Sequence, residues 1–211
     1  MKKLLLIGIL INVTMVVAQD FSGAQDYAAP LPSDIQQKIQ VYGYEKAVPD
    51  LERYISKNPR SYDGLSALGK AKAIQGDLLT SLKYLVQAKD IKESADILDS
   101  GIYNSLGWVK FLNGDSEGAK QDIMKAIENQ QVLDPEVGEA AYNNLGIIYL
   151  HSNDTQNTEL YFNKARVLYN SKYAGENLKL LNVLEANRIS VYGNEPNPME
   201  KNMGSALENR K

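Results

Sequence analysis

The pair Leu-Gly occurs three times in this chain, and the three copies are 38 and 39 residues apart, at Leu68-Gly69, Leu106-Gly107 and Leu145-Gly146. The same chemistry follows each glycine. A small side chain comes twelve residues later, a large apolar one sixteen later and an alanine nineteen later: Ser81, Ala119 and Thr158; Leu85, Ile123 and Phe162; Ala88, Ala126 and Ala165. Self-similarity at this period indicates stacked copies of one supersecondary unit.

A turn signal follows each Leu-Gly pair at seven and eight residues, at Gly76-Asp77, Gly114-Asp115 and Asn153-Asp154. Glycine and asparagine tolerate the left-handed backbone conformation, and aspartate caps the helix that follows. The small residues let two helices approach closely, and the large ones fill the space between units. Each unit is therefore predicted to be two antiparallel helices.

At these residues the chain resembles the tetratricopeptide repeat, whose pattern is W-x2-L-G-x2-Y followed by A, F, A and often P. The resemblance implies an all-α fold, a right-handed solenoid of helical hairpins, with full units over 62–95, 100–133 and 139–172. A coincidental helical bundle would show the helical period without this spacing of small residues. The family's usual period is 34, and part of the excess is placed by Asp134 as an N-cap and Pro135 as the first helical residue.

Both ends depart from the full repeat. Residues 33–61 resemble a degenerate first unit that lacks Leu-Gly, and Pro49 should kink its second helix or mark the true start of that helix. Residues 173–191 form an amphipathic pattern suited to capping the last apolar face, through Leu178, Leu181, Val183, Leu184 and Ile189. Residues 19–32 and 192–211 hold too little apolar content to pack, so disorder is expected there.

The first 18 residues have the parts of a secretory signal peptide. Lys2 and Lys3 precede an apolar run, and Val16 and Ala18 predict cleavage after Ala18. The alternative is an uncleaved anchor, but the 15 residues from Leu4 to Ala18 fall short of the roughly 20 that span a bilayer. No other segment is as apolar, so no integral span is expected after cleavage. The segment resembles bacterial signals, which implies the periplasm.

Catalytic chemistry has few candidates in this sequence. There is no cysteine and one histidine, His151, which lies beside a turn without partner carboxylates at metal-ligand spacing. The run Asn113–Glu117 resembles part of a calcium loop, but it lacks the twelfth-position glutamate and coincides with the repeat's own turn. The net charge of −3 argues against nucleic acid. We expect no enzyme activity, no cofactor and no bound metal.

The resemblance implies that the first helix of each unit lines a concave groove. The groove residues that it implies are Lys70, Ile74, Trp108, Phe111, Leu112, Asn144, Ile147 and His151. Trp108 and Phe111 would give the groove an apolar centre that suits a helix or an extended peptide. The alternative is that a neighbouring helix of the chain covers Trp108, which would make it a core residue.

Two functions follow as expectations. The first is a periplasmic scaffold or adaptor that binds a protein or peptide partner in envelope, pilus or secretion-system assembly. The second is a structural subunit of an envelope complex that self-associates into homo-oligomers through leftover apolar faces.

Overall fold

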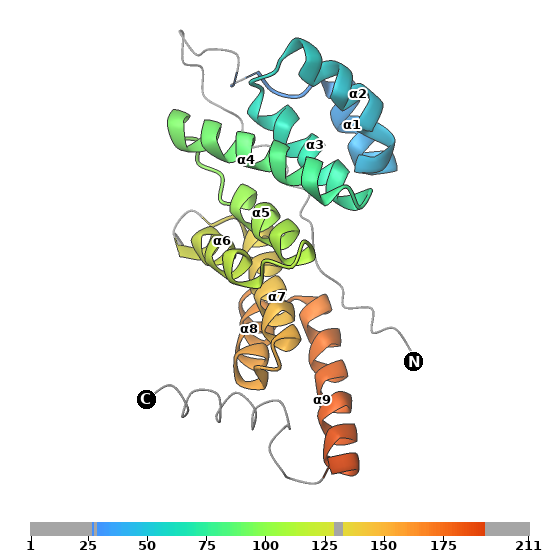
Figure 1. Ribbon diagram of the computed structural model, residues 1–211, viewed down its shortest axis with the longest axis vertical. Coiled ribbons are helices and arrows are strands. Elements are labelled where there is room, and N and C mark those ends of the chain that lie inside the picture. Colours follow the sequence, from blue (N-terminus) through green and yellow to red (C-terminus); the bar gives the residue numbers. More distant parts are fainter. Residues whose placement is uncertain (1–26, 28, 129–132, 193–211) are drawn as a thin grey trace.

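A computed structural model describes residues 27, 29–128 and 133–192, and in these residues it contains nine α-helices and no β-strand (Figure 1). The helices are α1 (Ser33–Tyr42), α2 (Tyr44–Lys57), α3 (Tyr62–Ile74), α4 (Leu78–Ala95), α5 (Gly101–Leu112), α6 (Ser116–Glu128), α7 (Pro135–His151), α8 (Thr155–Tyr169) and α9 (Lys172–Tyr192). The predicted signal peptide and C-terminal tail lie outside the described residues, apart from the last residue of α9.

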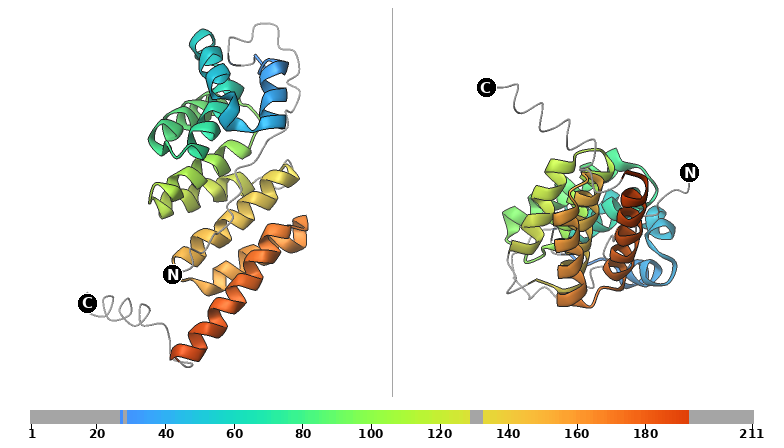
Figure 2. Two further views of the ribbon diagram at one scale, coloured as in Figure 1. Left: turned by 90° about the vertical axis from the view of Figure 1, so that its right-hand side faces the viewer. Right: turned by 90° about the horizontal axis from the view of Figure 1, so that it is seen from below.

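The first eight helices form four consecutive hairpins, which stack along the long axis of the molecule with α9 at the far end (Figures 1 and 2). The hairpin α3–α4 is called unit one below, α5–α6 unit two and α7–α8 unit three. This arrangement confirms the predicted all-α solenoid of helical hairpins.

The turns inside the hairpins have the predicted chemistry. Gly76, Gly114 and Asn153 have positive φ angles of 81°, 92° and 57°. The carboxylates of Asp77 and Asp154 accept hydrogen bonds from the backbone N–H groups three residues later, and so cap α4 and α8. The predicted cap at Asp134 is also confirmed, because its side chain accepts from the backbone N–H groups of residues 136 and 137 at the start of α7.

The glycine of each Leu-Gly pair marks the point where the two helices of a unit touch. A Cβ atom at Gly69 would lie 2.7 Å from the Leu85 side chain, and one at Gly146 would lie 2.4 Å from Phe162. The large residue sixteen positions later therefore packs on the glycine of its own unit. A side chain at this glycine would force the two helices apart.

The buried apolar residues form two clusters that meet in α5. Ile102, Leu106 and Val109 belong to the N-terminal cluster with α1 to α4, whereas Trp108 belongs to the C-terminal cluster with α6 to α9. Helix α5 therefore presents one apolar side to each half of the solenoid.

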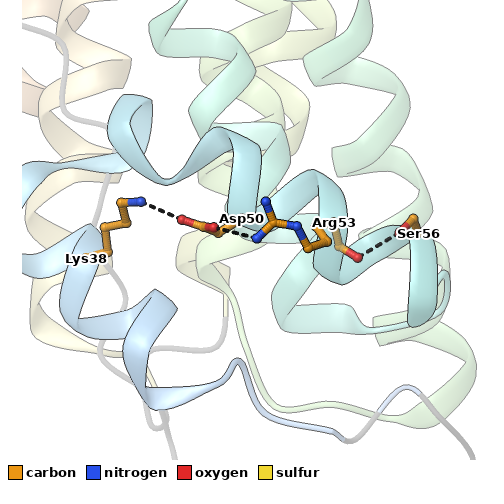
Figure 3. A network of polar contacts seen from close by, with 4 residues as sticks. All are labelled: Lys38, Asp50, Arg53 and Ser56. Atoms are coloured by element: carbon orange, nitrogen blue, oxygen red, sulfur yellow. Dashed lines mark hydrogen bonds and ion pairs between the residues drawn. The ribbon is translucent and has the colours of Figure 1, made fainter.

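The N-terminal hairpin lacks Leu-Gly, and one ion pair joins its two helices (Figure 3). Lys38 Nζ of α1 lies 2.6 Å from Asp50 Oδ2 of α2, and Arg53 Nη1 lies 3.1 Å from the other oxygen of the same carboxylate. The hydrogen bond from Lys38 is the main cause that lowers the pKa of Asp50 below its ordinary value. Further along α2, the Ser56 hydroxyl donates to the Arg53 carbonyl.

The structure decides between the two alternatives for Pro49 and places Leu31 where disorder was expected. Helix α2 begins at Tyr44 and continues through Pro49, so the proline does not mark its start. Leu31, in the segment expected to be disordered, is buried in the N-terminal cluster. The Ser61 hydroxyl donates to the carbonyl of Ala29 at 3.3 Å. A single leucine and backbone hydrogen bonds therefore hold the described end of a segment whose composition is mostly polar.

Candidate partner-binding face

The eight predicted groove residues divide into a buried set and an accessible set. All lie on the first helices of their units, α3, α5 and α7. The buried set is Lys70, Trp108, Asn144 and Ile147, which are 3%, 6%, 0% and 1% exposed. The accessible set is Ile74 at 42%, Leu112 at 45%, the exposed His151 and the half-buried Phe111.

Trp108 is a core residue in this structure. It lies one position after its repeat glycine, as do Lys70 and Ile147, and all three are buried. Trp108 packs in the C-terminal cluster together with residues of α6, α7 and α8. The side chain at this position points toward the next unit, which covers it. The expected apolar strip centred on Trp108 is therefore not open to a partner, and the alternative that the chain itself covers Trp108 is the one observed.

The accessible residues form a row along one edge of the solenoid. Ile74, Leu112 and His151 are each five positions after their glycine, and each is the last residue of its helix. Phe111 joins two units of this row, since its ring centroid is 5.3 Å from that of Trp108 and 5.4 Å from that of His151, the latter edge-to-face. We call Ile74, Phe111, Leu112 and His151 the terminal row.

Buried amides link successive first helices. Asn144 of α7 donates through Nδ2 to Asn104 Oδ1 of α5 at 3.2 Å, and Asn177 of α9 donates to Asn143 Oδ1 of α7 at 3.0 Å. The sequence reasoning predicted Asn144 only. The signal for the others was available, because Asn104 and Asn143 both lie three residues before a repeat glycine.

Asn104 keeps one donor without a partner. Its Nδ2 atom is buried and makes no hydrogen bond, although its Oδ1 atom accepts from Asn144. A buried donor without a partner costs about 1–3 kcal/mol of desolvation. The polar layer between α5 and α7 is therefore only partly satisfied.

A partly buried polar group lies between the start of α3 and the start of α5. The Tyr62 hydroxyl donates to the Asp99 carboxylate, whose other oxygen accepts from the backbone N–H of Gly101 at 2.6 Å. Burial raises the pKa of Asp63, and the charge of Asp99 adds to that rise, whereas the backbone of Leu31 and the charge of Lys70 oppose it. The charge of Lys70 therefore lowers the pKa of Asp63, a carboxylate of its own helix.

Other kinds of site were sought in the part of the chain that the structure describes. These residues contain no group of three or more His, Asp or Glu side chains placed to hold a metal ion. None of the nine described helices combines the length and the apolar content that a membrane span needs.

The sequence profile of the family described as Tetratricopeptide repeat matches residues 100–132, which cover unit two. The crystal structure of MamA has a similar fold, with a TM-score of 0.56 and 17% sequence identity over 82% of this chain and 96% of that chain. No curated protein sequence matches. The repeat spacing, the glycine contacts between helices and this profile match together identify tetratricopeptide-repeat units in this chain.

Proposed function

We propose that this protein is a scaffold without catalytic activity that binds a protein or peptide segment along the terminal row. The supporting observation is the recurrence of an accessible residue at one repeat position in three consecutive units, Ile74, Leu112 and His151. Large side chains at equivalent helix ends offer a partner a continuous contact surface. The tetratricopeptide-repeat fold itself suggests interaction with other proteins.

Buried side chains on the same helices adjoin the row. Trp108 and Ile147 are buried one helical turn before Leu112 and His151, and Phe111 packs on Trp108. A partner that contacts this row meets side chains already held in place, so little conformational entropy is lost on binding. Aromatic side chains in such a setting are common anchors of interfaces.

The test uses a matched pair of surface leucines. Leu112 in the terminal row and Leu160 on α8 are both 45% exposed. Peptides selected from a displayed random library on the wild-type protein should bind Leu112→Gln at least tenfold more weakly, whereas Leu160→Gln should bind them as the wild type does. Equal affinity for both variants would refute binding at the terminal row.

A second candidate is self-association through the outer face of α8. Leu160, Val167 and Leu168 of this helix are 45%, 69% and 60% exposed, at spacings that place them on one side. Sedimentation velocity over a hundredfold range of concentration distinguishes the two functions. A monomer throughout favours the scaffold, and a mass that rises with concentration and falls in Val167→Asp favours the self-associating subunit.

We also propose that the scaffold works in the periplasm, within envelope, pilus or secretion-system assembly. The support is the N-terminal sequence, with Lys2 and Lys3 before an apolar run that ends at Ala18. Protein recovered from a periplasmic extract should begin at Gln19, as measured by intact mass. An intact Met1 in the membrane fraction would instead indicate an anchored protein.

A further inference from the structure

The turn of each of the four hairpins contains one residue in the left-handed conformation, and this includes the degenerate first hairpin. Gly43, between α1 and α2, has a φ of 81°, the same as Gly76 in unit one. The residue two positions before Gly76 is Ile74 of the terminal row, and the residue two positions before Gly43 is Val41. Val41 is 60% exposed, so the N-terminal hairpin also carries an accessible apolar side chain at this place.

The packing of α2 on α3 places Val41 at the same edge of the solenoid as the terminal row. Lys72, near the end of α3, lies 2.6 Å from Glu52 of α2. A Cβ atom at Gly64, near the start of α3, would lie 2.6 Å from Ile55, which is nearer the end of α2. The two helices are therefore antiparallel, and α2 begins beside the end of α3. Only one residue separates α1 from α2, so the end of α1 lies at this edge too. We call Val41 together with the terminal row the extended row.

Each full unit places an aspartate beside the extended row, directly after its left-handed residue: Asp77, Asp115 and Asp154. Asp77 and Asp115 are exposed, and each accepts its capping hydrogen bond with the Oδ1 atom. Their second oxygens accept no hydrogen bond from the part of the chain that the structure describes, whereas Asp154 engages both oxygens with Asn157. The first two aspartates therefore keep a charged oxygen for a partner.

The basic residues in the last turns of α3 and α5 do not neutralise these aspartates, because each is paired with another carboxylate. Lys72 of α3 has its ion pair with Glu52. Lys110 of α5 lies 2.6 Å from Asp122. Among the described residues, no ion pair includes either of the two exposed aspartates. The edge therefore offers apolar side chains along the row and uncompensated negative charge beside it.

We infer that the partner of the terminal row is a protein segment that combines apolar side chains with lysine or arginine, and that this segment continues over Val41 on the first hairpin. The inference rests on the proposed binding at the terminal row and specifies what binds there. The apolar side chains of the segment pack on the extended row, and its cations meet Asp77 and Asp115. An acidic segment meets like charges at this edge, which opposes its binding.

The test uses peptides selected from a displayed random library on the wild-type protein at low ionic strength. These peptides should be enriched in lysine and arginine over the unselected library. The double variant Asp77→Asn with Asp115→Asn keeps both helix caps, because asparagine caps as well as aspartate does. It should bind the peptides at least about threefold more weakly, which is the size of effect that two exposed ion pairs have. The difference should shrink at about 0.5 M salt, where exposed charges are screened.

The matched control for charge is Asp34→Asn with Glu136→Gln. These exposed acidic residues lie in the first turns of α1 and α7, at the opposite edge of the solenoid, and their replacement changes the net charge by the same amount. This control should bind the peptides as the wild type does.

A second pair of variants tests the first hairpin. Val41→Gln should weaken peptide binding at least about threefold, because it removes an apolar contact. Leu98→Gln changes a side chain that is 75% exposed between α4 and α5, at the opposite edge, and should have no effect. Thermal melting of all variants verifies that they are folded.

Several outcomes would overturn the inference. If Leu112→Gln weakens binding and the Asp77 and Asp115 double variant does not, binding at the terminal row stands and the cationic partner is refuted. Equal weakening by the two acidic double variants would mean that net charge alone attracts the peptides. Full affinity in Val41→Gln would end the surface at unit one. Full affinity in Leu112→Gln would instead refute the proposed function itself.

Discussion

Units two and three make the same contact with different chemistry. Three positions after the repeat glycine and fifteen after it, unit two has Lys110 and Asp122, whose Nζ and Oδ2 atoms are 2.6 Å apart. Unit three has Tyr149 and Tyr161 at the same two positions, with ring centroids 5.2 Å apart and planes within 5°. The repeat therefore fixes which positions meet between the two helices, and either an ion pair or an aromatic stack can fill them.

The ion pair and the aromatic stack differ in the free energy that desolvation costs. The Asp122 side chain is 9% exposed and that of Lys110 is 28% exposed, so forming the pair removes much of the water from both charges. The tyrosine rings bury apolar area, and an aromatic pair contributes about 0.5–1.5 kcal/mol beyond that area. Lys120 of unit two also lies 5.1 Å from the Tyr149 ring, which ties the stack to the preceding unit. We expect unit three to be the more stable of the two.

The largest predicted effect concerns Trp108, the residue of unit two that packs in the core of unit three. Trp108→Ala should lower the free energy of unfolding by about 3–5 kcal/mol, because it leaves a cavity in the C-terminal cluster. Urea unfolding followed by circular dichroism measures the loss. The control is Leu112→Ala, which removes a side chain that is 45% exposed and should cost much less. A loss below about 1 kcal/mol for Trp108→Ala would mean that its ring faces a partner and not the core.

The second prediction asks whether the units pack equally tightly. Ala126 and Ala165 occupy the same position in units two and three, and they are 1% and 0% exposed. Replacing either with leucine should overpack the contact between helices and cost about 1–3 kcal/mol. Thermal melting of both variants gives the comparison. An unchanged melting temperature in either would show that its helix contact has free space.

The third prediction exchanges the chemistry of the two units. The double variant Lys110→Tyr with Asp122→Tyr gives unit two the pair that unit three has. Apolar groups that replace a desolvated ion pair are often neutral or stabilising, so we expect a change between zero and a gain of about 1 kcal/mol. Asp122→Ala alone should be destabilising, since it leaves Lys110 without its partner. If the double variant is less stable than Asp122→Ala, then unit two lacks the space for two tyrosine rings, and packing volume rather than charge determines which side chains it accepts.

The smallest effect is a dependence on alkaline pH, to which tyrosines of both units should contribute. Burial raises the pKa of Tyr149, Tyr161 and Tyr169 in unit three, and it raises the pKa of Tyr103 in unit two to about 12. A folded-state pKa above the unfolded value of 10 means that stability is fully present below pH 10 and is lost as the pH rises toward 12.

Urea unfolding between pH 8 and 11 tests this prediction. Tyr149→Phe removes one titrating group and should flatten the loss, whereas Tyr173→Phe, at an exposed tyrosine of α9, should not. Identical pH profiles for the wild type and Tyr149→Phe would contradict the assignment.

The sequence predicts the local features of this fold well. The turns at Gly76, Gly114 and Asn153 and the cap at Asp134 depend on residues within a few positions of one another, so their patterns are sufficient. The register of the units follows from the same patterns, because the repeat glycine has one fitting partner in its own hairpin.

The candidate site is predicted only in part, because its exposure depends on contacts between units. Trp108 and Phe111 are three residues apart in one helix, yet the next unit covers Trp108 and leaves Phe111 half-buried. Contacts between units join residues far apart in the sequence, such as Asn104 and Asn144, which lie 40 positions apart. Leu31 was missed for the same reason, since its burial depends on helices that follow it in the chain.

The division of the apolar core at α5 has a mechanical consequence. A chain pulled from its two ends extends first where the least buried surface opposes the force, and this molecule has two separate clusters that meet at one helix. Extension under tension should therefore proceed in two steps, with one half lengthening while the other holds its shape.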